Sequence, residues 1–474
     1  MTVFTVRDKK DSLQSDDWEV VHSPSKRNGT AAQTSNKSIS AMKEETRQYT
    51  IITTSLLIPG AGTPIKNAVL VIEDKLIAWV GRLSELPKKF SETSHRSVSV
   101  PYLMPGLWDS HVHFAAIPDD ATSNAAMLIT HPAEQGARLA KGCWQWLQWG
   151  YTSVRDMGGF GCEVARAIDD GSIVGPNIYS SGGGLTQIGG HGDYHDLPAG
   201  MIMKNMSVAN ILPGHYGTEC FTVADGIEEC RRAVRLNIRR GARCIKVIAS
   251  GGVGSLNDDV SCAQYSSEEL RCIVEEASRQ NIAVGAHAHA KAGIVAAVNA
   301  GVTTIEHGSF ADRETLEVIK NKGVVLIATR TITELLMSTR GEGLPQQIWE
   351  KINLVATANR DSYAMAVKMG LKIALGTDRT PGFSSSKELE YAVDAGMSNL
   401  EAIEAATANG PLTVGLKAPK SGQLKVGYEA DIIGLQENPV DDVKILQNID
   451  NIKWVWKAGL AFKGPGIGPW GEEL

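Results

Sequence analysis

Short apolar segments alternate with longer amphipathic segments through the middle of the chain, from about residue 105 to residue 415. Most of the amphipathic segments end in Gly or Asn, the residues that tolerate the left-handed conformation at a helix end. This alternation predicts strands that are each followed by a helix, and hence a parallel sheet. The predicted strands are the segment before His111 and residues 152–158, 177–183, 244–252, 283–289, 303–308, 324–330 and 372–378.

Eight strand–helix repeats in about 300 residues favour a (β/α)₈ TIM barrel, an α/β fold whose usual size is about 250 residues. A doubly wound open sheet is the alternative. No GxGxxG motif follows the first strand to support it.

Two short β-rich blocks flank the repeats, at residues 47–104 and 415–474. Neither block is long enough to bury a good core alone, so we expect one small β domain built from both ends of the chain. Residues 105–414 then form the barrel domain. Residues 1–46 are polar and rich in Ser and Lys, which is typical of a disordered arm. A docking role for this arm in an oligomer is the alternative.

The net charge of the chain bears on which classes of partner it could bind. The net charge of −6 argues against nucleic acid or an anionic membrane as the main partner. We expect no transmembrane helix, since no long apolar stretch is present. The seven cysteines are scattered and the start of the chain has no apolar signal region, so we expect a cytoplasmic protein, although secretion by another route stays open. We also expect a homo-oligomer.

Polar side chains lie at the carboxyl ends of the predicted strands, which converge on one face of a barrel, where active sites are built. His111 and His113 are one residue apart, so both side chains point to the same face of a strand. Lys246 lies within an apolar strand, where an ammonium is costly unless it is paired or chemically altered. The other strand-end residues are His287 and His289 in the fifth strand, His307 in the sixth and Asp378 in the eighth.

Each of these residues alone has an ordinary explanation, such as a hydrogen-bonded core histidine, a helix-capping aspartate or a lysine that reaches the rim. Their joint occurrence favours a metal site. Imidazole and carboxylate ligands suit Zn²⁺ best, with Co²⁺, Mn²⁺ or Ni²⁺ as alternatives. A neutral lysine amine can add CO₂, and a carbamate on Lys246 could bridge two divalent metal ions.

Three further residues could contact a substrate. His289 could donate to a substrate carbonyl, or it could simply pack. His191 follows the third strand in a Gly-rich loop and could face the same mouth. Arg330, at the end of the seventh strand, could bind a substrate carboxylate in a bidentate way, and a structural ion pair explains it equally well.

The segment GLWDSHVHF together with Lys246, His287, His307 and the GTD that ends at Asp378 resembles the amidohydrolase superfamily, in its binuclear branch with a carboxylated lysine. The flanking segments KNAVLVIEDKLIAWVG and GQLKVGYEADIIGLQENPVDDV resemble the composite β-sandwich of that superfamily. Within it, the chain is most similar to imidazolonepropionase-like and Xaa-Pro dipeptidase-like hydrolases. The segments THPAEQGARLAKGCW, GHGD, LPAG and FKGPGIGPWGE resemble a fungal amidase-carboxypeptidase.

The resemblance implies a role for each strand-end residue. His111, His113 and Asp378 would hold the first metal, and His287 and His307 the second, with carboxylated Lys246 between them. A metal-bridging hydroxide would attack the amide carbonyl. Asp378 would take a proton from the bridging water and deliver it to the leaving amine.

The resemblance further implies hydrolysis of ochratoxin A, the phenylalanine amide of a chlorinated isocoumarin, to ochratoxin alpha and phenylalanine. Hydrolysis of Xaa-Pro dipeptides or of cyclic amides at the same site are alternatives. A deaminase is disfavoured because the mononuclear deaminases lack a lysine at the position of Lys246. A non-catalytic barrel that serves as an assembly module is disfavoured because all six ligand positions are filled.

The spacing of the two strand-one histidines yields a first prediction. Because both imidazoles would reach one metal, His111→Ala is expected to lower metal content and hydrolytic activity together. Elemental analysis of the metal bound per chain, on the samples used for the activity assay, checks this. A variant that keeps full activity with two metals bound would contradict it.

Overall fold

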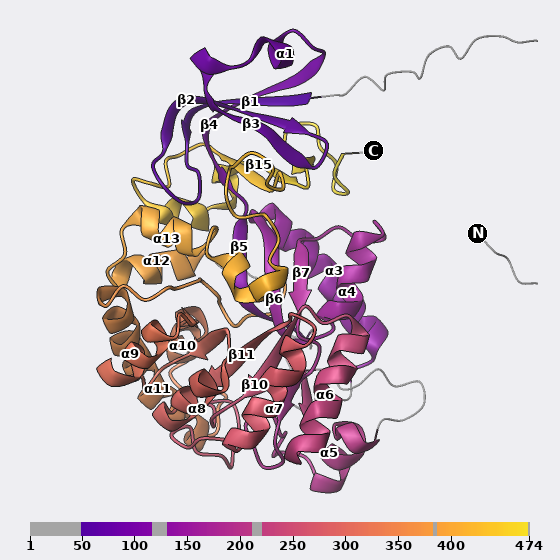
Figure 1. Ribbon diagram of the computed structural model, residues 1–474, viewed down its shortest axis with the longest axis vertical. Coiled ribbons are helices and arrows are strands. Elements are labelled where there is room, and N and C mark those ends of the chain that lie inside the picture. The colour runs from indigo at the N-terminus through magenta and orange to yellow at the C-terminus, as the bar shows by residue number, and fades with distance from the viewer. Residues whose placement is uncertain (1–48, 116–129, 211–219, 383–385, 473–474) are drawn as a thin grey trace, which may run out of the picture. The chain divides into compact units, whose positions relative to one another are not determined.

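The computed structural model describes residues 49–115, 130–210, 220–382 and 386–472 (Figure 1). The chain divides into two compact units, Met1–Thr46 and Arg47–Leu474. The predicted arm at residues 1–46 lies outside the described residues, so the fold below is that of the second unit. Within the described ranges, no helix has the length and apolarity needed to cross a membrane.

A seven-stranded sheet combines strands from both ends of the second unit, in the order β16-β15-β14-β4-β1-β2-β3. Figure 1 shows its indigo and yellow strands together. Strands β1 and β4 run parallel and the other pairs run antiparallel. The strands are β1 (Tyr49–Leu57), β2 (Ile65–Glu73), β3 (Leu76–Arg82), β4 (His95–Pro105), β14 (Ile432–Leu435), β15 (Ile452–Lys457) and β16 (Leu460–Lys463).

Apolar side chains from both ends of the chain pack on this sheet. Leu70 and Leu103 from the first block share one buried cluster with Ile432 and Trp456 from the second. The two blocks that the sequence singled out therefore join in one sheet. The division into a sandwich domain and a barrel domain stays a prediction.

The middle of the chain forms two parallel sheets, which confirms the predicted α/β class. One has the order β5-β6-β7 and the other the order β13-β12-β11-β10-β8-β9. The strands are β5 (Leu107–Phe114), β6 (Tyr151–Gly159), β7 (Asn177–Ser180), β8 (Gly184–Thr186), β9 (Phe221–Val223), β10 (Cys244–Ile248), β11 (Ala283–Ala288), β12 (Thr304–His307) and β13 (Val325–Ile327).

Residues 372–379 do not form a regular strand, although an eighth strand was expected there. They nevertheless lie between β13 and β5. The amide of Ala374 donates to the carbonyl of Leu326 (3.1 Å), and the amide of Ser110 donates to the carbonyl of Leu375 (2.8 Å). The two parallel sheets are also linked between β7 and β10. The amide of Arg243, just before β10, donates to the carbonyl of Ser180 at the end of β7 (2.7 Å). The ladders of the described strands do not by themselves close a barrel, so closure stays a prediction.

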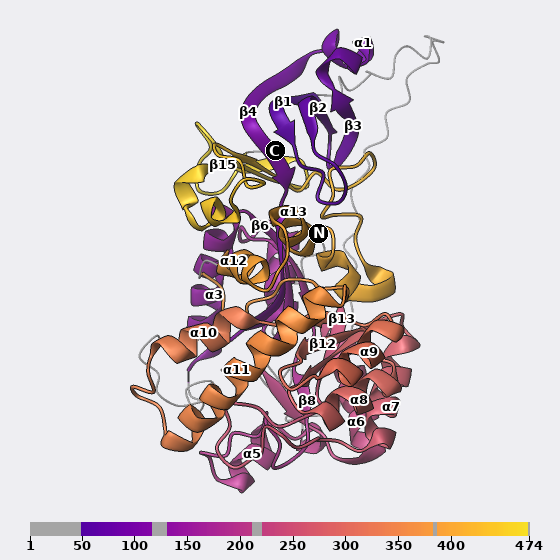
Figure 2. The same ribbon diagram turned by 90° about the vertical axis from the view of Figure 1, so that its left-hand side faces the viewer.

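Helices follow most strands, and several lie where the sequence showed no clear pattern. These are the short helices α4 (Gly161–Asp169), α5 (Ala199–Asn205), α10 (Arg330–Ser338), α12 (Lys387–Asp394) and α13 (Asn399–Ala405), and segments of this length carry little periodicity. Helix α11 (Gln346–Lys368) packs against α10 (Figure 2). The longer helices are α3 (Pro132–Gln148), α6 (Gly226–Arg240), α7 (Ser267–Ser278), α8 (Lys291–Ala300) and α11 (Gln346–Lys368). The shorter ones are α1 (Lys88–Ser91), α4 (Gly161–Asp169), α5 (Ala199–Asn205), α9 (Arg313–Asn321), α10 (Arg330–Ser338), α12 (Lys387–Asp394) and α13 (Asn399–Ala405). The 3₁₀ segments are η1 (Leu83–Glu85), η2 (Val208–Asn210), η3 (Gly410–Lys417), η4 (Val443–Gln447) and η5 (Ile449–Asn451).

Candidate metal centre

Two histidines and an aspartate meet at the end of β5. The rings of His111 and His113 lie 5.4 Å apart. Asp378 Oδ1 lies 3.1 Å from His113 Nε2 and 3.5 Å from His111 Nε2. Backbone hydrogen bonds from residues 377 and 378 to the carbonyl of His111 hold the two segments together. Asp378 thus lies close to both histidines, but in the compact ligand sets it groups with His111 and His307 and not with His113.

Three more histidines pack beside this group. The ring centroids of His287, His289 and His307 lie 4.6 to 4.8 Å apart, and His307 lies 5.2 Å from His111. Two sets of ligand atoms are compact enough to hold a metal ion, and both include His307. They are His287 with His289 and His307, and His111 with His307 and Asp378. His289, expected to contact substrate, therefore also has the geometry of a ligand.

Lys246 lies next to His111 at the edge of one ligand set. It comes from the buried centre of β10, and its Nζ is 3.4 Å from His111 Nε2. Burial lowers the pKa of the Lys246 ammonium to about 8. Roughly a tenth of the amine is then neutral at pH 7, and the neutral amine is the form that reacts with CO₂.

Each imidazole uses one nitrogen to bind the surrounding protein and leaves the other toward the centre. Four rings are held through Nδ1 and one through Nε2. Such contacts fix the tautomer and the orientation of metal-binding histidines. The contacts are His111 Nδ1 with Glu306 Oε2 (2.8 Å), His113 Nδ1 with the Gly158 carbonyl (3.2 Å), His289 Nδ1 with Ser309 Oγ (2.8 Å), His307 Nδ1 with Thr329 Oγ1 (2.6 Å) and His287 Nε2 with the Gly251 carbonyl (3.3 Å).

The electrostatics of the cluster suit the binding of a cation. Burial lowers the pKa of His111 to about 4 and that of His289 to about 3, so both rings are neutral at neutral pH. Metal ligation requires neutral imidazoles. Burial alone would raise the pKa of Asp378, but its contacts with His111, His113 and Lys246 hold that pKa below its ordinary value.

Glu306 and Arg155 form a fully buried ion pair behind His111. The Arg155 guanidinium donates to both carboxylate oxygens of Glu306, at 2.7 and 2.8 Å. Burial opposes ionisation of Glu306, yet the charge of Arg155 holds the pKa of this carboxyl well below its ordinary value. We did not predict this pair from the sequence. The sequence does show that Glu306 lies within the apolar segment TTIEHG and Arg155 within the apolar segment TSVRDMG, where a charged side chain is unusual.

Three residues at the strand ends adopt a left-handed backbone. They are His307 (φ 70°), Thr329 (φ 49°) and Asp378 (φ 58°). This conformation is unfavourable for residues other than Gly, Asn and Asp, so it persists where surrounding contacts enforce it. Two of the three residues are candidate ligands, and the third holds His307 through its hydroxyl.

Of the two remaining predicted residues, His191 lies beside the histidine cluster and Arg330 forms other contacts. The ring of His191 stacks on that of His287, with centroids 4.6 Å apart, so His191 lies beside the cluster. The Arg330 guanidinium instead contacts Glu334 (2.9 Å) and lies over the ring of Tyr391 (4.7 Å). These contacts favour the structural ion pair for Arg330 over the binding of a substrate carboxylate.

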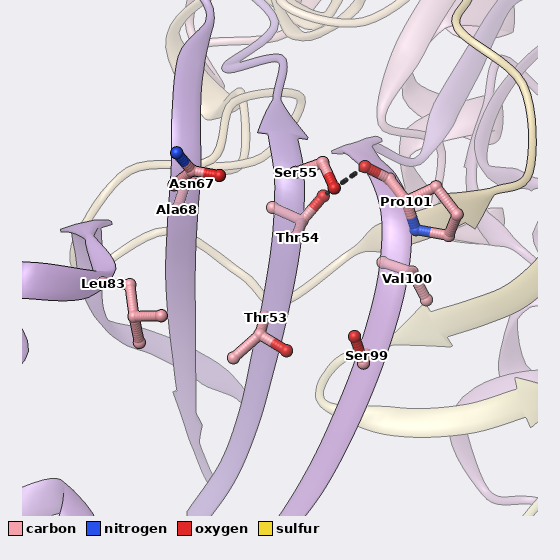
Figure 3. Close-up of a pocket in the computed structure, with 9 residues that line it drawn as sticks. All are labelled: Thr53, Thr54, Ser55, Asn67, Ala68, Leu83, Ser99, Val100 and Pro101. Carbon is pink, nitrogen blue, oxygen red and sulfur yellow. Dashed lines mark hydrogen bonds between the residues drawn. The ribbon is translucent and has the colours of Figure 1, made fainter.

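A separate pocket of about 280 Å³ lies on the seven-stranded sheet, between β1, β2 and β4 (Figure 3). Hydroxyl and aliphatic side chains line it, and the Thr54 hydroxyl donates to the carbonyl of Pro101 at 2.9 Å. The residues described as lining it include no ionisable side chain. It therefore offers no acid, base or metal ligand, and the histidine cluster is the candidate site.

Comparison of the sequence and the fold with known proteins shows which family the chain is similar to. The amidohydrolase family matches residues 102–461. Ochratoxinase of Aspergillus niger is 54% identical over 427 residues, which cover 90% of this chain and 89% of the relative. Its crystal structure aligns with a TM-score of 0.89 over 90% of this chain and 98% of that one.

Two more distant relatives act on other substrates. A prolidase crystallised with N-methylphosphonate-L-proline is 30% identical and aligns with a TM-score of 0.77, over 88% of this chain and 100% of that one. Imidazolonepropionase of Nocardia farcinica is 22% identical over 83% of this chain and 91% of the relative. The family match spans well over half of the sequence and contains every candidate ligand. The chain therefore belongs to the amidohydrolase family.

Proposed function

We propose that this protein is a binuclear metal-dependent hydrolase that releases an amino acid from an N-acyl amino acid, as ochratoxinase does. As a member of the family it is a hydrolase of amide bonds. The observation that carries the proposal is the cluster of five ligand residues, His111, His287, His289, His307 and Asp378, with Lys246 Nζ 3.4 Å from His111 Nε2. His307 has one free nitrogen and would serve one of the two ions. One set alone would suit a mononuclear enzyme, and the buried lysine would then have no role.

The donor atoms fit two divalent cations, most simply Zn²⁺. The ligands are imidazole nitrogens and a carboxylate, and no cysteine belongs to either set. Lys246 would complete the site as a carbamate, which forms when the neutral amine adds to CO₂ and releases a proton. When bound, two such ions lower the pKa of water and polarise a carbonyl oxygen.

Residues of the chain would carry out the proton transfers and contact the substrate. Asp378 Oδ1 lies within reach of both His111 and His113, so it can accept a proton from the attacking water. The same carboxyl then protonates the leaving amine as the C–N bond breaks. His289 either completes the second ligand set or donates to the substrate carbonyl, and His191 lies next to it at the edge of the cluster.

The substrate we propose is ochratoxin A, since the ochratoxinase relative shares over half of its residues with this chain. Xaa-Pro dipeptides are the second candidate, favoured by the prolidase with its proline-based ligand. The imidazolonepropionase relatives keep cyclic amides as a third candidate. A non-catalytic assembly module is disfavoured, because the chain has a residue able to ligate a metal at all six proposed ligand positions.

We also infer that the parallel strands close into a (β/α)₈ barrel and that the two end blocks form a composite sandwich. Closure is supported by the backbone hydrogen bonds of residues 372–379 to β13 and β5, and of Arg243 to Ser180. A cytoplasmic homo-oligomer remains our expectation for the assembled protein.

The substrate proposal predicts that the zinc-loaded protein releases phenylalanine from ochratoxin A. A metal-chelated sample should lose the activity, and zinc should restore it. Product analysis by chromatography, with an N-acyl-phenylalanine and a Xaa-Pro dipeptide as parallel substrates, checks the reaction. Release from the dipeptide alone would replace the first substrate candidate by the second, and no release from any of them would contradict amide hydrolysis at this site.

The carbamate proposal predicts that Lys246→Ala abolishes activity and that a short carboxylic acid such as acetate restores part of it. The variant leaves a space next to His111, and acetate supplies two oxygens and the negative charge of the missing carbamate. Activity and metal content at increasing acetate measure the rescue, with chloride at equal ionic strength as the control. Equal activity in both salts would exclude a bridging role for Lys246.

The contact between Glu306 and His111 predicts that Glu306→Gln weakens metal binding by about 10- to 100-fold, since it alters the partner that orients a ligand. It should also destabilise the fold, because Arg155 is left as an uncompensated buried charge. Competition with a coloured chelator measures the metal affinity, and urea unfolding measures the stability. The exposed Glu314→Gln on α9 serves as the control, and unchanged affinity in Glu306→Gln would refute the orienting role.

A further inference from the structure

The loop that follows β10 is anchored to helix α11 by a nearly buried lysine. Lys351 Nζ donates to the carbonyls of Gly252 (3.2 Å) and Ser255 (2.9 Å) and to Asp258 Oδ1 (2.7 Å). Only 11% of the Lys351 side chain and 2% of that of Asp258 are exposed. A desolvated ion pair with additional hydrogen bonds holds its partners in one arrangement, so the loop has a fixed position over the site.

The same loop clamps the ring of His191. One face of the ring stacks on His287, with the planes 20° apart. Gly252 also lies against the ring, since an added Cβ there would lie within 2.5 Å of three ring atoms. His191 Nδ1 lies 2.8 Å from Ser255 Oγ. In the described part of the chain, Nε2 is then the ring nitrogen for which no protein hydrogen-bond partner is found.

The hydrogen-bond chain determines which nitrogen of His191 carries the proton. Ser255 has one hydroxyl hydrogen, and its short contact with Asp258 Oδ1 uses it, since a carboxylate paired with an ammonium can only accept. Ser255 Oγ is then an acceptor toward His191, whose Nδ1 must donate. His191 Nε2 consequently carries a lone pair.

We propose that Lys351 and Asp258 are positioning residues that hold His191 in the Nδ1–H tautomer, so that its Nε2 accepts a hydrogen bond from an N–H or O–H group of the substrate. The inference rests on the proposed function for the substrate contact, whereas the tautomer itself does not depend on any activity. The inference adds to the proposed function the kind of substrate group, an N–H or O–H donor, that binds next to His191.

Nitrogen NMR of the zinc-loaded full-length protein, labelled with ¹⁵N-histidine, tests the tautomer directly. The signals of His191 are assigned by their loss in His191→Gln. In the unaltered protein we expect Nδ1 at the shift of a protonated nitrogen and Nε2 at that of an unprotonated one. Ser255→Ala removes the acceptor and should move His191 toward the Nε2–H tautomer. An Nε2–H signal in the unaltered protein would overturn the proposal.

Kinetics test the positioning role. Lys351→Met keeps the length of the side chain and removes its charge, and it should raise KM by about tenfold, the size of one lost hydrogen bond, with kcat and metal content within twofold. Lys351→Arg should restore most of the KM. Lys368→Met, an exposed lysine near the other end of α11, is the matched control.

The outcomes separate the two proposals. A normal KM in Lys351→Met, with correct folding shown by circular dichroism, would overturn the positioning role. A loss of kcat or of metal would assign Lys351 a general structural role instead and would equally contradict it. If no substrate is hydrolysed at all, the proposed function fails while the NMR experiment still decides the tautomer.

Discussion

The buried pair of Arg155 and Glu306 is the interaction on which the centre depends. Glu306 orients His111, and Arg155 in turn donates to the carbonyl of Ser110 on β5 (2.6 Å) and to Thr304 on β12 (3.0 Å). A third contact reaches the carbonyl of Thr413 in η3 (3.3 Å). One guanidinium therefore joins three segments that are far apart in sequence, and its planar group of donors is suited to this task. Replacement by lysine would keep the charge and lose most of these bonds.

The interior next to the candidate metal centre is polar where a core is ordinarily apolar. Lys246, Arg155 and Glu306 are each at most 2% exposed. Such groups lower stability unless their charges and hydrogen bonds compensate one another. Here Glu306 lies between the cations and accepts from His111, so the polar residues form one connected set. The left-handed backbone at His307 and Thr329 adds a further local cost. Local unfavourable features of this kind concentrate at functional sites.

The sequence predicts the site better than it predicts what supports the site. The spacing of His111 and His113 and the strand-end positions of His287, His307 and Asp378 follow from strand periodicity, and the structure brings these residues together. The roles of Glu306 and Arg155 do not follow, because periodicity states that a residue faces inward but not which distant residue it meets. Arg330 illustrates the same limit: its strand-end position suggested a substrate contact, whereas its neighbours Glu334 and Tyr391 come from helices whose packing the pattern could not provide.

Helix α11 shows how such support can come from outside the sheet. Asn359 donates to the carbonyls of His307 (3.2 Å) and Ala328 (2.9 Å), and Ser362 donates to that of Gly308 (2.9 Å). Lys351 precedes Asn359 by two helical turns, so both project from the same side of the helix. One helix face thus holds the turn that carries His307 and the loop that clamps His191. Because the helix is a single rigid element, the two rings keep their relative positions even though their own segments are 116 residues apart in the chain. A shift of α11 would therefore displace the contacts of both His307 and His191.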